Sequence, residues 1–393
     1  MPWQELKPMD QRILFIADHL RDLCSFSELC RRYGISRKTG YKWVDRYSAH
    51  DLEGLADRDR RPHNSPQRVP FAVRQAVLSL RQRGTLVLGP KKIQALLAQR
   101  FPDIPLPSKT TIYNILNAAD LIEPRRRRTR VPTIASPLAS AAGPNEIWSA
   151  DFKGQFLLGN RQWCYPLTVM DQETRYLIGC HGLKSTAADG TQTVFERWFR
   201  EYGLPQRIRT DNGVPFATRS AGGLSKLAVW WIRLGIVPER IEPGRPQQNG
   251  RHERMHRTMK KAVTSPVKAS FKSQQCHFDA FRRDYNDERP HESLDQATPS
   301  SRYTSSVRSF PDKLPELEYP SHYQLRNVGS AGVVYIQNQQ AYLSYLLADQ
   351  TVALEAIDED CWDVHFGPIR LGRLDASNPS PKSKRKEYLT LKV

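Results

Sequence analysis

The sequence predicts a multidomain protein with N-terminal all-α helix-turn-helix units, a central α/β core and a small C-terminal β-barrel. Three observations carry this prediction. Up to about residue 122, apolar residues recur with helical period between helix caps. From Asn145 the chain changes to short β-branched and aromatic runs with an amphipathic stretch among them. After about residue 320 only short strand-like runs remain, separated by turn residues.

The first unit is expected over residues 1–58. A helix over 10–24 has one apolar face, and Ser25 followed by Glu28 has capping-box form. Gly34 tolerates the left-handed turn that ends a second helix, and Ser36 can cap a third, SRKTGYKWVDRY.

A basic stripe marks that third helix. Lys38, Lys42 and Arg46 recur every four residues, and Tyr41, Val44 and Tyr47 can pack behind them. The stripe is typical of a DNA-recognition helix. A solvated charged face on an ordinary helical hairpin has the same pattern, so the alternative stays open.

A second helix-turn-helix or winged-helix-like domain is expected over residues 66–122. Its helices are FAVRQAVLSLRQR, GPKKIQALLAQRF and KTTIYNILNAADL, the last capped by Ser108. Residues 123–144, with four consecutive arginines and a run of Pro, Ala and Ser, form a basic linker. Up to this point a transcription factor would look the same.

The α/β core is expected over residues 145–300. The runs EIWSADFKGQF, RQWCYPLTVMD and RYLIGCHGL predict a three-stranded meander. A helix around residues 194–202 and the short strand RIRTD follow.

Three acids fall at chemically useful places in this core. Asp151 lies in the first strand, Asp211 ends the later strand before Asn212-Gly213, and Glu253 lies on a helix that begins near Asn249. Taken alone, an acid at such a place more often stabilises a turn than belongs to a functional site. A fourth, Asp171, competes as a ligand, but its position before Gln172 and Glu173 favours a hairpin turn.

The three acids together predict a metal site for phosphodiester chemistry. In-line displacement needs the attacking and leaving oxygens neutralised, which two hard cations about 3.5 to 4 Å apart achieve. Carboxylates on two strands and one helix supply the oxygen ligands that Mg²⁺ prefers. We therefore predict Asp151, Asp211 and Glu253 as catalytic and metal-binding residues, with Mg²⁺ as cofactor and Mn²⁺ as a substitute.

Charge predicts the partner. The 393 residues include 59 Lys and Arg against 41 Asp and Glu, a formal net charge of +18. Residues 1–130 hold 25 of the basic and 13 of the acidic side chains, two thirds of the excess. A polyanion, double-stranded DNA, is the expected partner. The predicted DNA contacts are Arg37, Lys38, Lys42, Arg46, Lys109, His256, Arg257 and Lys260.

Composition excludes other classes. With 39% hydrophobic residues the chain can bury real cores, which excludes wholesale disorder. Its composition also excludes the collagen-like and coiled-coil classes. No run approaches eighteen apolar residues, and MPWQELKPMDQR lacks the order of a secretory signal. Six cysteines form no CxxC pair. We expect a cytoplasmic protein with reduced thiols and no membrane contact.

Four segments resemble a known family. WSADFKGQF, RTDNGVPF, GRPQQNGRHERMHRTMK and YNDERPHESL together resemble the integrase catalytic core of insertion-sequence transposases, most closely the IS481 type related to IS3 transposases and retroviral integrases. The resemblance implies a ribonuclease-H-like core in which Asp151, Asp211 and Glu253 match the catalytic acids. It also implies a DDE transposase that cuts element ends and joins them to target DNA.

Two departures from the family are visible. Forty-one residues separate Asp211 from Glu253, more than is usual in integrases, because of the stretch ATRSAGGLSKL. The His/Cys zinc module of retroviral integrases is missing, so no zinc is expected there. Binding would involve the element's terminal repeats and a target duplex, and a homo-oligomer is expected because two ends must be joined together.

Two alternatives remain at this stage. One is a DNA-binding regulator, such as a domesticated and inactive transposase. The other is a zinc metalloprotease, because His252-Glu253-Arg254-Met255-His256 is literally HExxH. Against the protease, a Pro- and Gly-rich loop precedes the motif, and Asp151 and Asp211 are left unexplained.

The end of the chain is expected to fold separately. Residues 320–376 contain five short strand-like runs with Asn, Asp and Gly turns, which predict the small β-barrel. It carries several acids between Asp349 and Asp363, so a protein contact is as plausible as a nucleic-acid contact. Residues 377–393 are predicted to be a basic tail.

Overall fold

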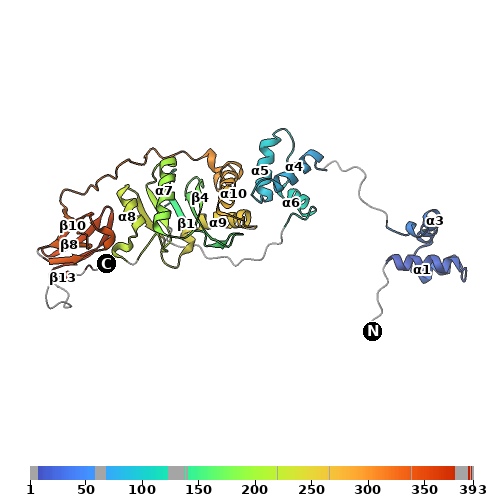
Figure 1. Cartoon of the computed structure of the whole chain (residues 1–393). Helices are drawn as coiled ribbons and strands as arrows, with labels where there is room; N and C mark the ends of the chain where they lie inside the picture. Colours follow the sequence, from blue (N-terminus) through green and yellow to red (C-terminus); the bar gives the residue numbers. More distant parts are fainter. Residues whose placement is uncertain are drawn as a thin grey trace. The chain divides into compact units, whose positions relative to one another are not determined.

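The computed structural model describes residues 8–57, 68–122, 138, 140–218, 220–264, 266–337, 339–376, 388–389 and 391 (Figure 1). The chain divides into two compact units, Met1–Arg68 and Val69–Val393. The predicted basic linker and basic tail lie mostly outside the described residues. Across the described helices, none is long and apolar enough to cross a membrane.

The first unit contains three helices, as the sequence predicts: α1 (Pro8–Leu20), α2 (Phe26–Arg32) and α3 (Arg37–Gly54). Ser25 Oγ accepts the Glu28 N–H at the start of α2, and Ser36 Oγ accepts the Thr39 N–H at the start of α3. These caps satisfy N–H groups that have no partner within the helix. α1 ends before the predicted Cys24, because Asp22 has a φ of 49°.

The core of the first unit differs from the predicted packing. Tyr41, expected behind the basic stripe, is 55% exposed and stacks on Phe26 at 4.2 Å between ring centroids. Trp43 is only 8% exposed and packs in the core with Phe15 and Leu29. The indole therefore fills the space that the sequence interpretation gave to Tyr41, because it is the larger apolar surface on the inward side of α3. Val44 and Tyr47 do pack against this core, as predicted.

The second unit begins with three more helices: α4 (Phe71–Gln82), α5 (Pro90–Arg100) and α6 (Lys109–Asn117). Ser108 Oγ accepts the Thr111 N–H and so caps α6 as predicted. Their inward faces form one apolar cluster, whose fully buried members are Val73, Val77, Ile93, Leu97, Ile112 and Leu116.

Polar contacts attach these helices to residues 284–292, in the last part of the core domain. The Asp284 carboxylate accepts the backbone N–H and the hydroxyl of Thr85, at 2.7 and 2.8 Å. Arg83 pairs with Glu288 at 2.8 Å, and Lys91 pairs with Glu292 at 2.5 Å. Part of the basic charge of this domain is therefore used within the chain.

The core is a mixed sheet of six strands: β1 (Ile147–Phe152), β2 (Phe156–Leu157), β3 (Trp163–Asp171), β4 (Leu177–Leu183), β5 (Arg207–Thr210) and β6 (Val237–Arg240). β3 pairs antiparallel with β1, β2 and β4, which confirms the predicted meander. β1 then pairs parallel with β5, and β5 pairs parallel with β6. β5 is therefore an internal strand of the sheet, and Asp211 follows at its carboxyl end.

Helices cover both faces of the sheet: α7 (Ala188–Tyr202), α8 (Lys226–Arg233), α9 (Gly250–Val263) and α10 (Phe271–Arg283). On one face α7 and α8 pack large aromatic side chains against Trp148 and Ala150 of β1. On the other face α9 and α10 pack against β3 and β4. Because successive strand residues point to opposite faces, Ser149 and Asp151 face α9.

Asp171 has the turn role that the sequence predicts. It is fully buried at the end of β3, and its carboxylate accepts the backbone N–H groups of Asn145 and Thr174, each at 2.8 Å. The Thr174 hydroxyl donates a third hydrogen bond at 2.7 Å. All of these contacts hold the β3–β4 turn and the start of β1.

The C-terminal strands form two sheets: β7 (Gln324–Asn327), β10 (Thr351–Asp358), β11 (Cys361–Phe366) and β12 (Ile369–Asp375) in one, and β8 (Val333–Ile336), β9 (Gln339–Tyr342) and β13 (Tyr388–Leu389) in the other. The two sheets share one apolar cluster. The described strands thus form two sheets packed around one core, in the region where the sequence predicts a small β-barrel.

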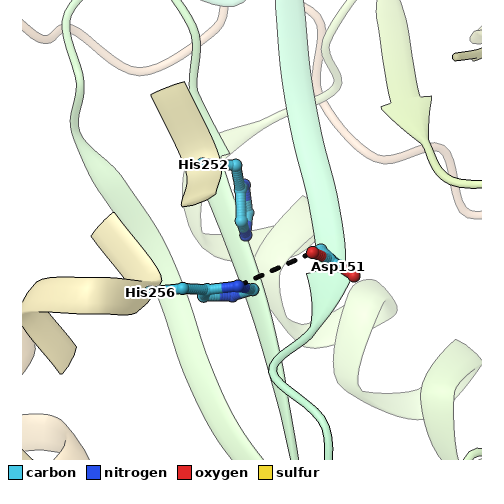
Figure 2. Close-up of side chains that lie close together, drawn as sticks. All are labelled: Asp151, His252 and His256. Atoms are coloured by element: carbon cyan, nitrogen blue, oxygen red, sulfur yellow. Dashed lines mark ion pairs between the residues drawn. The ribbon is translucent and has the colours of Figure 1, made fainter. Parts of the chain in front are cut away.

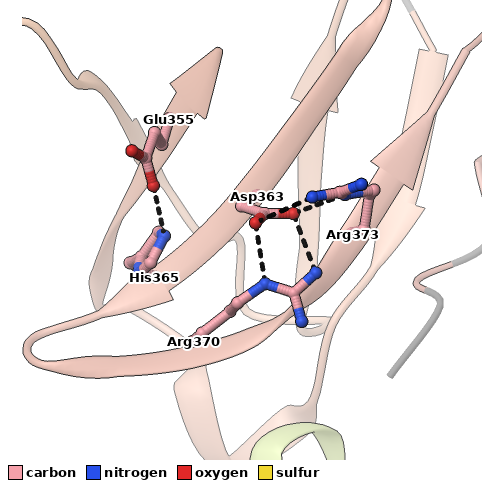
Figure 3. Close-up of polar contacts among 5 residues, drawn as sticks. All are labelled: Glu355, Asp363, His365, Arg370 and Arg373. Carbon is pink, nitrogen blue, oxygen red and sulfur yellow. Dashed lines mark hydrogen bonds and ion pairs between the residues drawn. The ribbon is translucent and has the colours of Figure 1, made fainter. Parts of the chain in front are cut away.

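Two acids of this region, Asp363 and Glu355, have basic partners on the same sheet (Figure 3). Both guanidinium groups of Arg370 and Arg373 bind the Asp363 carboxylate, with Nε to oxygen distances of 2.8 and 2.7 Å. His365 Nε2 lies 3.0 Å from Glu355 Oε2. These acids are therefore partly neutralised by neighbours on the same sheet.

Candidate active site

Asp151 and Asp211 are brought together by the parallel pairing of β1 and β5. The register pairs Ile147 with Arg207 and Ser149 with Arg209. Two residues further along each chain come Asp151, near the end of β1, and Asp211, immediately after β5. Because both strands run the same way, both carboxylates lie at the carboxyl end of the sheet.

A tight turn fixes the backbone after Asp211. Asp211 Oδ1 accepts the Gly213 N–H at 3.0 Å, the local bond typical of an aspartate that starts a turn. Asn212 Nδ2 donates to Ile241 O at 2.7 Å, which ties this turn to the segment after β6. A Cβ on Gly213 would lie 3.2 Å from Asp211 Oδ2, so a side chain there would crowd the carboxylate.

Glu253 enters from the first turn of α9, which begins at Gly250 as the sequence predicts. The helix is held by its buried face, where Met255, Met259 and Val263 are at most 1% exposed. Arg251 adds a bond from its guanidinium to Gln172 O at 2.8 Å. Glu253 itself is exposed on the outer side of that first turn.

The neighbouring acids act on the pKa of Asp151. Burial, together with the negative charges of Asp211 and Glu253, raises this pKa to about 7. Lys153 and a backbone hydrogen bond at Phe152 act in the opposite direction but do not cancel the effect. Asp211 and Glu253 thus both lie close enough to Asp151 to raise its pKa.

The two histidines of the HExxH segment are packed under this site (Figure 2). His252 is fully buried and His256 is 5% exposed. Burial lowers the pKa of both imidazoles, that of His252 to about 3, so both are neutral at pH 7. His256 Nδ1 lies 3.6 Å from Asp151 Oδ2, and Figure 2 shows its ring beside that carboxylate.

Thr168 of β3 is the common partner of both rings. Its Oγ1 lies 2.7 Å from His252 Nε2 and 2.7 Å from His256 Nε2. The same hydroxyl donates to Asp151 O at 3.0 Å. His252 Nδ1 contacts Ser149 Oγ at 2.7 Å, so both of its nitrogens are occupied.

This arrangement does not support the zinc-protease alternative. In an HExxH protease two imidazole nitrogens converge on zinc. Here both Nε2 atoms converge on the Thr168 hydroxyl, and His252 is closed to solvent. Asp151, His252 and His256 do form a group whose potential ligand atoms all lie within 4.8 Å of one another.

The predicted DNA contacts are distributed over three places. Arg37, Lys38 and Lys42 are exposed on α3, and Arg46 is partly buried. Lys42 Nζ and the Arg46 guanidinium lie over the Trp43 ring, 4.3 and 4.9 Å from its centroid. The stripe therefore exists as an outward surface braced by an aromatic ring.

The remaining contacts lie in the second unit. Lys109 is exposed at the start of α6, and Arg257 and Lys260 are exposed on α9 on the same side as Glu253. His256 was predicted with them, but this was wrong for its side chain. It is buried against Thr168 and neutral, so it does not present a charge to a phosphate.

Sequence analysis missed Thr168 and Ser149 as neighbours of the site. A signal existed, because the β1–β3 register places Thr168 directly opposite Asp151. It could not be used from sequence, since neither the register nor the face that α9 covers was known.

Two family models described as integrase core domain match residues 141–246 and 234–299. A helix-turn-helix domain model matches residues 11–63, and a homeodomain-like domain model matches residues 39–116.

Similar proteins come from bacterial insertion elements. An insertion element IS407 protein of Burkholderia multivorans is 30% identical over 195 residues, 48% of this chain and 66% of that protein. An insertion element IS476 protein of Xanthomonas euvesicatoria is 27% identical over 217 residues, 54% of this chain and 59% of that protein. The chain thus spans less than two thirds of each relative's length.

Among solved structures, the HTLV-2 integrase catalytic core domain in complex with magnesium matches 41% of this chain and 98% of its own, with 16% identity and a TM-score of 0.33. The family models cover the helix-turn-helix units as well as the whole integrase core. The chain is therefore similar to proteins of bacterial insertion elements, and it contains an integrase core domain preceded by helix-turn-helix domains.

Proposed function

We propose that this protein is a DDE-type transposase that cuts the ends of its element and joins them to target DNA with Mg²⁺ as cofactor. One observation carries the proposal: the parallel register of β1 and β5 brings Asp151 and Asp211 to neighbouring strand ends, where Asp211 and Glu253 both raise the pKa of Asp151. The integrase-core matches cover the segments of all three acids and favour the same chemistry.

The donor set fits hard divalent cations. Asp151, Asp211 and Glu253 offer carboxylate oxygens from two strands and a helix, which are rigid supports. Burial and the charges of the neighbouring acids raise the pKa of Asp151, so its ionised form is unfavourable without added positive charge. When bound, divalent cations would supply that charge and stabilise the attacking and leaving oxygens of a phosphodiester.

The other residues would position DNA. Arg257 and Lys260 project from α9 beside Glu253, where they could hold backbone phosphates near the acids. In the first step a water oxygen bonds to phosphorus and the bond to the 3′ oxygen breaks, leaving a 3′ hydroxyl. In the second step that hydroxyl attacks a target phosphodiester, whose own 3′ oxygen leaves. Neither step links DNA covalently to the protein.

The helix-turn-helix units would bind the terminal repeats of the element. Their exposed basic side chains release counterions from the duplex, so binding is expected to fall steeply with salt. Two ends must be joined to one target, so the active assembly is expected to be a homo-oligomer on DNA.

The experiment is an end-cleavage and strand-transfer assay on the DNA that flanks the gene, with and without Mg²⁺. Asp211→Asn keeps the size of the side chain and removes its charge. We expect it to lower both reactions by at least about a hundredfold, as loss of a preorganised charge-stabilising group does. Full strand transfer by a folded Asp211→Asn protein would overturn the proposal.

A matched control removes an acid that lies elsewhere. Asp189 is exposed on α7 and pairs with Lys226 at 2.7 Å. Asp189→Asn makes the same chemical change without touching the acids at the end of the sheet. We expect both reactions to proceed at the rate of the unmodified protein.

A further inference from the structure

The hydroxyl of Thr168 determines which nitrogens of the buried histidines carry protons. It has one hydrogen and can accept two others. Its three partners are Asp151 O, His252 Nε2 and His256 Nε2. A carbonyl oxygen only accepts, so the one hydroxyl proton goes to Asp151 O. Both imidazoles must then donate from Nε2 for all three contacts to be hydrogen bonds.

The two second nitrogens have different surroundings as a result. Each neutral imidazole that is protonated at Nε2 has a lone pair on Nδ1. The lone pair of His252 accepts the Ser149 hydroxyl at 2.7 Å, in preference to Met170 O, which lies 3.3 Å from the same hydroxyl. The lone pair of His256 instead faces Asp151 Oδ2 at 3.6 Å, acceptor against acceptor.

While Asp151 is ionised, such a pair is unfavourable alone and favourable around a cation. Neither atom has a proton to share when Asp151 is ionised and His256 is neutral. Two ligand atoms bound to one ion at about 2.1 Å lie roughly 3 to 3.5 Å apart, close to the separation seen here. Fixing of one ring nitrogen by a hydrogen bond so that the other binds metal is also the usual arrangement for histidine ligands.

We propose that His256 Nδ1 is a nitrogen ligand for a divalent transition-metal ion that Asp151 also binds. His252 is excluded from this role because both of its nitrogens have partners. Thr168 is a positioning residue, since it holds His256 in the required tautomer. The inference rests on the proposed function only in placing a cation at Asp151.

The chemical consequence is a choice between ions. Mg²⁺ prefers oxygen ligands, whereas imidazole suits transition metals. The site should therefore bind Mn²⁺ more tightly than three carboxylates alone would, with little gain for Mg²⁺.

The decisive experiment uses the unmodified full-length chain loaded with Mn²⁺ and pulsed electron paramagnetic resonance. A directly bound imidazole gives nitrogen modulation of the Mn²⁺ signal. We expect that modulation, and we expect it to change when the protein is prepared with ¹⁵N-labelled histidine. Because no residue is altered, folding does not affect this test.

Variants identify the ring. His256→Gln retains an N–H group that can reach Thr168 but removes Nδ1. We expect loss of the nitrogen modulation and about tenfold or more weaker Mn²⁺ binding, with Mg²⁺ binding within about threefold. His277→Gln on α10 is the matched control and should leave both unchanged. Circular dichroism and thermal melting check the fold of each.

The outcomes separate the two proposals. If Mn²⁺ binding depends on Asp151 and Asp211 but shows no histidine nitrogen, the assignment of His256 is wrong and the acidic site stands. If neither Asp151→Asn nor Asp211→Asn weakens Mn²⁺ binding, the proposed function fails as well. Nitrogen modulation that persists in His256→Gln would also overturn the inference.

Discussion

Asp151 and Asp211 lie beside each other at the carboxyl ends of the parallel strands β1 and β5, and burial together with the charge of Asp211 raises the pKa of Asp151 to about 7. An isolated carboxyl in the unfolded chain has a pKa near 3.9. Between these two values the folded protein holds a proton that the unfolded chain has released. Stability must therefore fall as pH rises through this range.

Asp151→Asn is expected to stabilise the metal-free protein at neutral pH. The amide cannot ionise, so the variant escapes the loss of stability between about pH 4 and pH 7. About three pKa units correspond to at most roughly 4 kcal/mol, with 1 to 2 kcal/mol more realistic for a partly accessible group. Urea unfolding at pH 4 and pH 8 in EDTA measures the difference, which should be small at pH 4 and full at pH 8.

Mg²⁺ should reverse that order. A cation that binds only the folded state raises its stability by mass action, and it needs the Asp151 charge. Unmodified protein should gain stability with Mg²⁺ at pH 8, while Asp151→Asn gains less. A variant that is less stable than the unmodified protein in EDTA at pH 8 would contradict the pKa assignment.

Lys42→Ala is expected to weaken binding to the element's terminal repeats. Lys42 is exposed on α3, and its Nζ lies 4.3 Å from the centroid of Trp43. Loss of one phosphate contact should reduce the slope of log K against log salt by about 1 and leave Mn²⁺ binding unchanged. Fluorescence anisotropy from 50 to 200 mM salt measures this slope.

The control for Lys42→Ala is Arg200→Ala, which removes a charge already paired with Glu196 on α7 at 2.8 Å. Its salt slope should equal that of the unmodified protein. If Lys42→Ala also keeps the full slope, the basic stripe of α3 is a solvated surface and another face binds the duplex.

Local rules predicted much of this fold because they depend on neighbours in sequence. Ser25, Ser36 and Ser108 each cap the helix that follows. Each cap needs only the backbone N–H three residues later in the sequence. The acids were visible for a similar reason, since strand ends and Asp-Asn-Gly turns can be recognised locally. Their convergence was predicted from the strand and helix order together.

Features that depend on distant packing were not accessible in this way. His256 looked like a surface group at i+3 from Glu253, yet the pairing of β1 with β3 places Thr168 where it buries that ring. The burial of His256 thus depends on a partner more than eighty residues away in sequence. In the C-terminal region the alternation of apolar residues does not reveal which strands pair, so the division into two sheets was not predicted.

The stretch that lengthens the interval between Asp211 and Glu253 has a structural role. Residues Ala221–Gly223 form a 3-10 turn, and Ala221 and Leu224 belong to the apolar cluster of the C-terminal sheets. A Cβ on Gly222 would lie 3.0 Å from Leu371 Cδ2. The additional residues therefore pack against the C-terminal sheets, and they are not simply an enlarged loop at the acids.

Leu224→Ala should weaken the packing of the C-terminal sheets against residues 221–224. Leu224 is 4% exposed, and truncating a buried leucine typically costs about 2 to 5 kcal/mol. We expect a lower midpoint of urea unfolding and faster proteolysis of the segment from 302 to 323. Leu325→Ala on β7, where the leucine is 50% exposed, is the control and should change neither. Equal effects of the two substitutions would argue against the docking of the sheets on this stretch.

Asp363→Asn should destabilise the C-terminal sheets in a pH-dependent way. Hydrogen bonds from Arg370 and Arg373 hold the pKa of Asp363 well below its ordinary value. A carboxyl with a depressed folded pKa stabilises the fold above the unfolded pKa near 3.9, and this contribution is lost as pH falls further. The deficit of Asp363→Asn should therefore be full at pH 7 and smaller at pH 2.5, as measured by thermal melting. Glu359→Gln, at an exposed neighbouring turn, should show no such deficit. A deficit that is equal at both pH values would mean that Asp363 acts through packing and not through its charge.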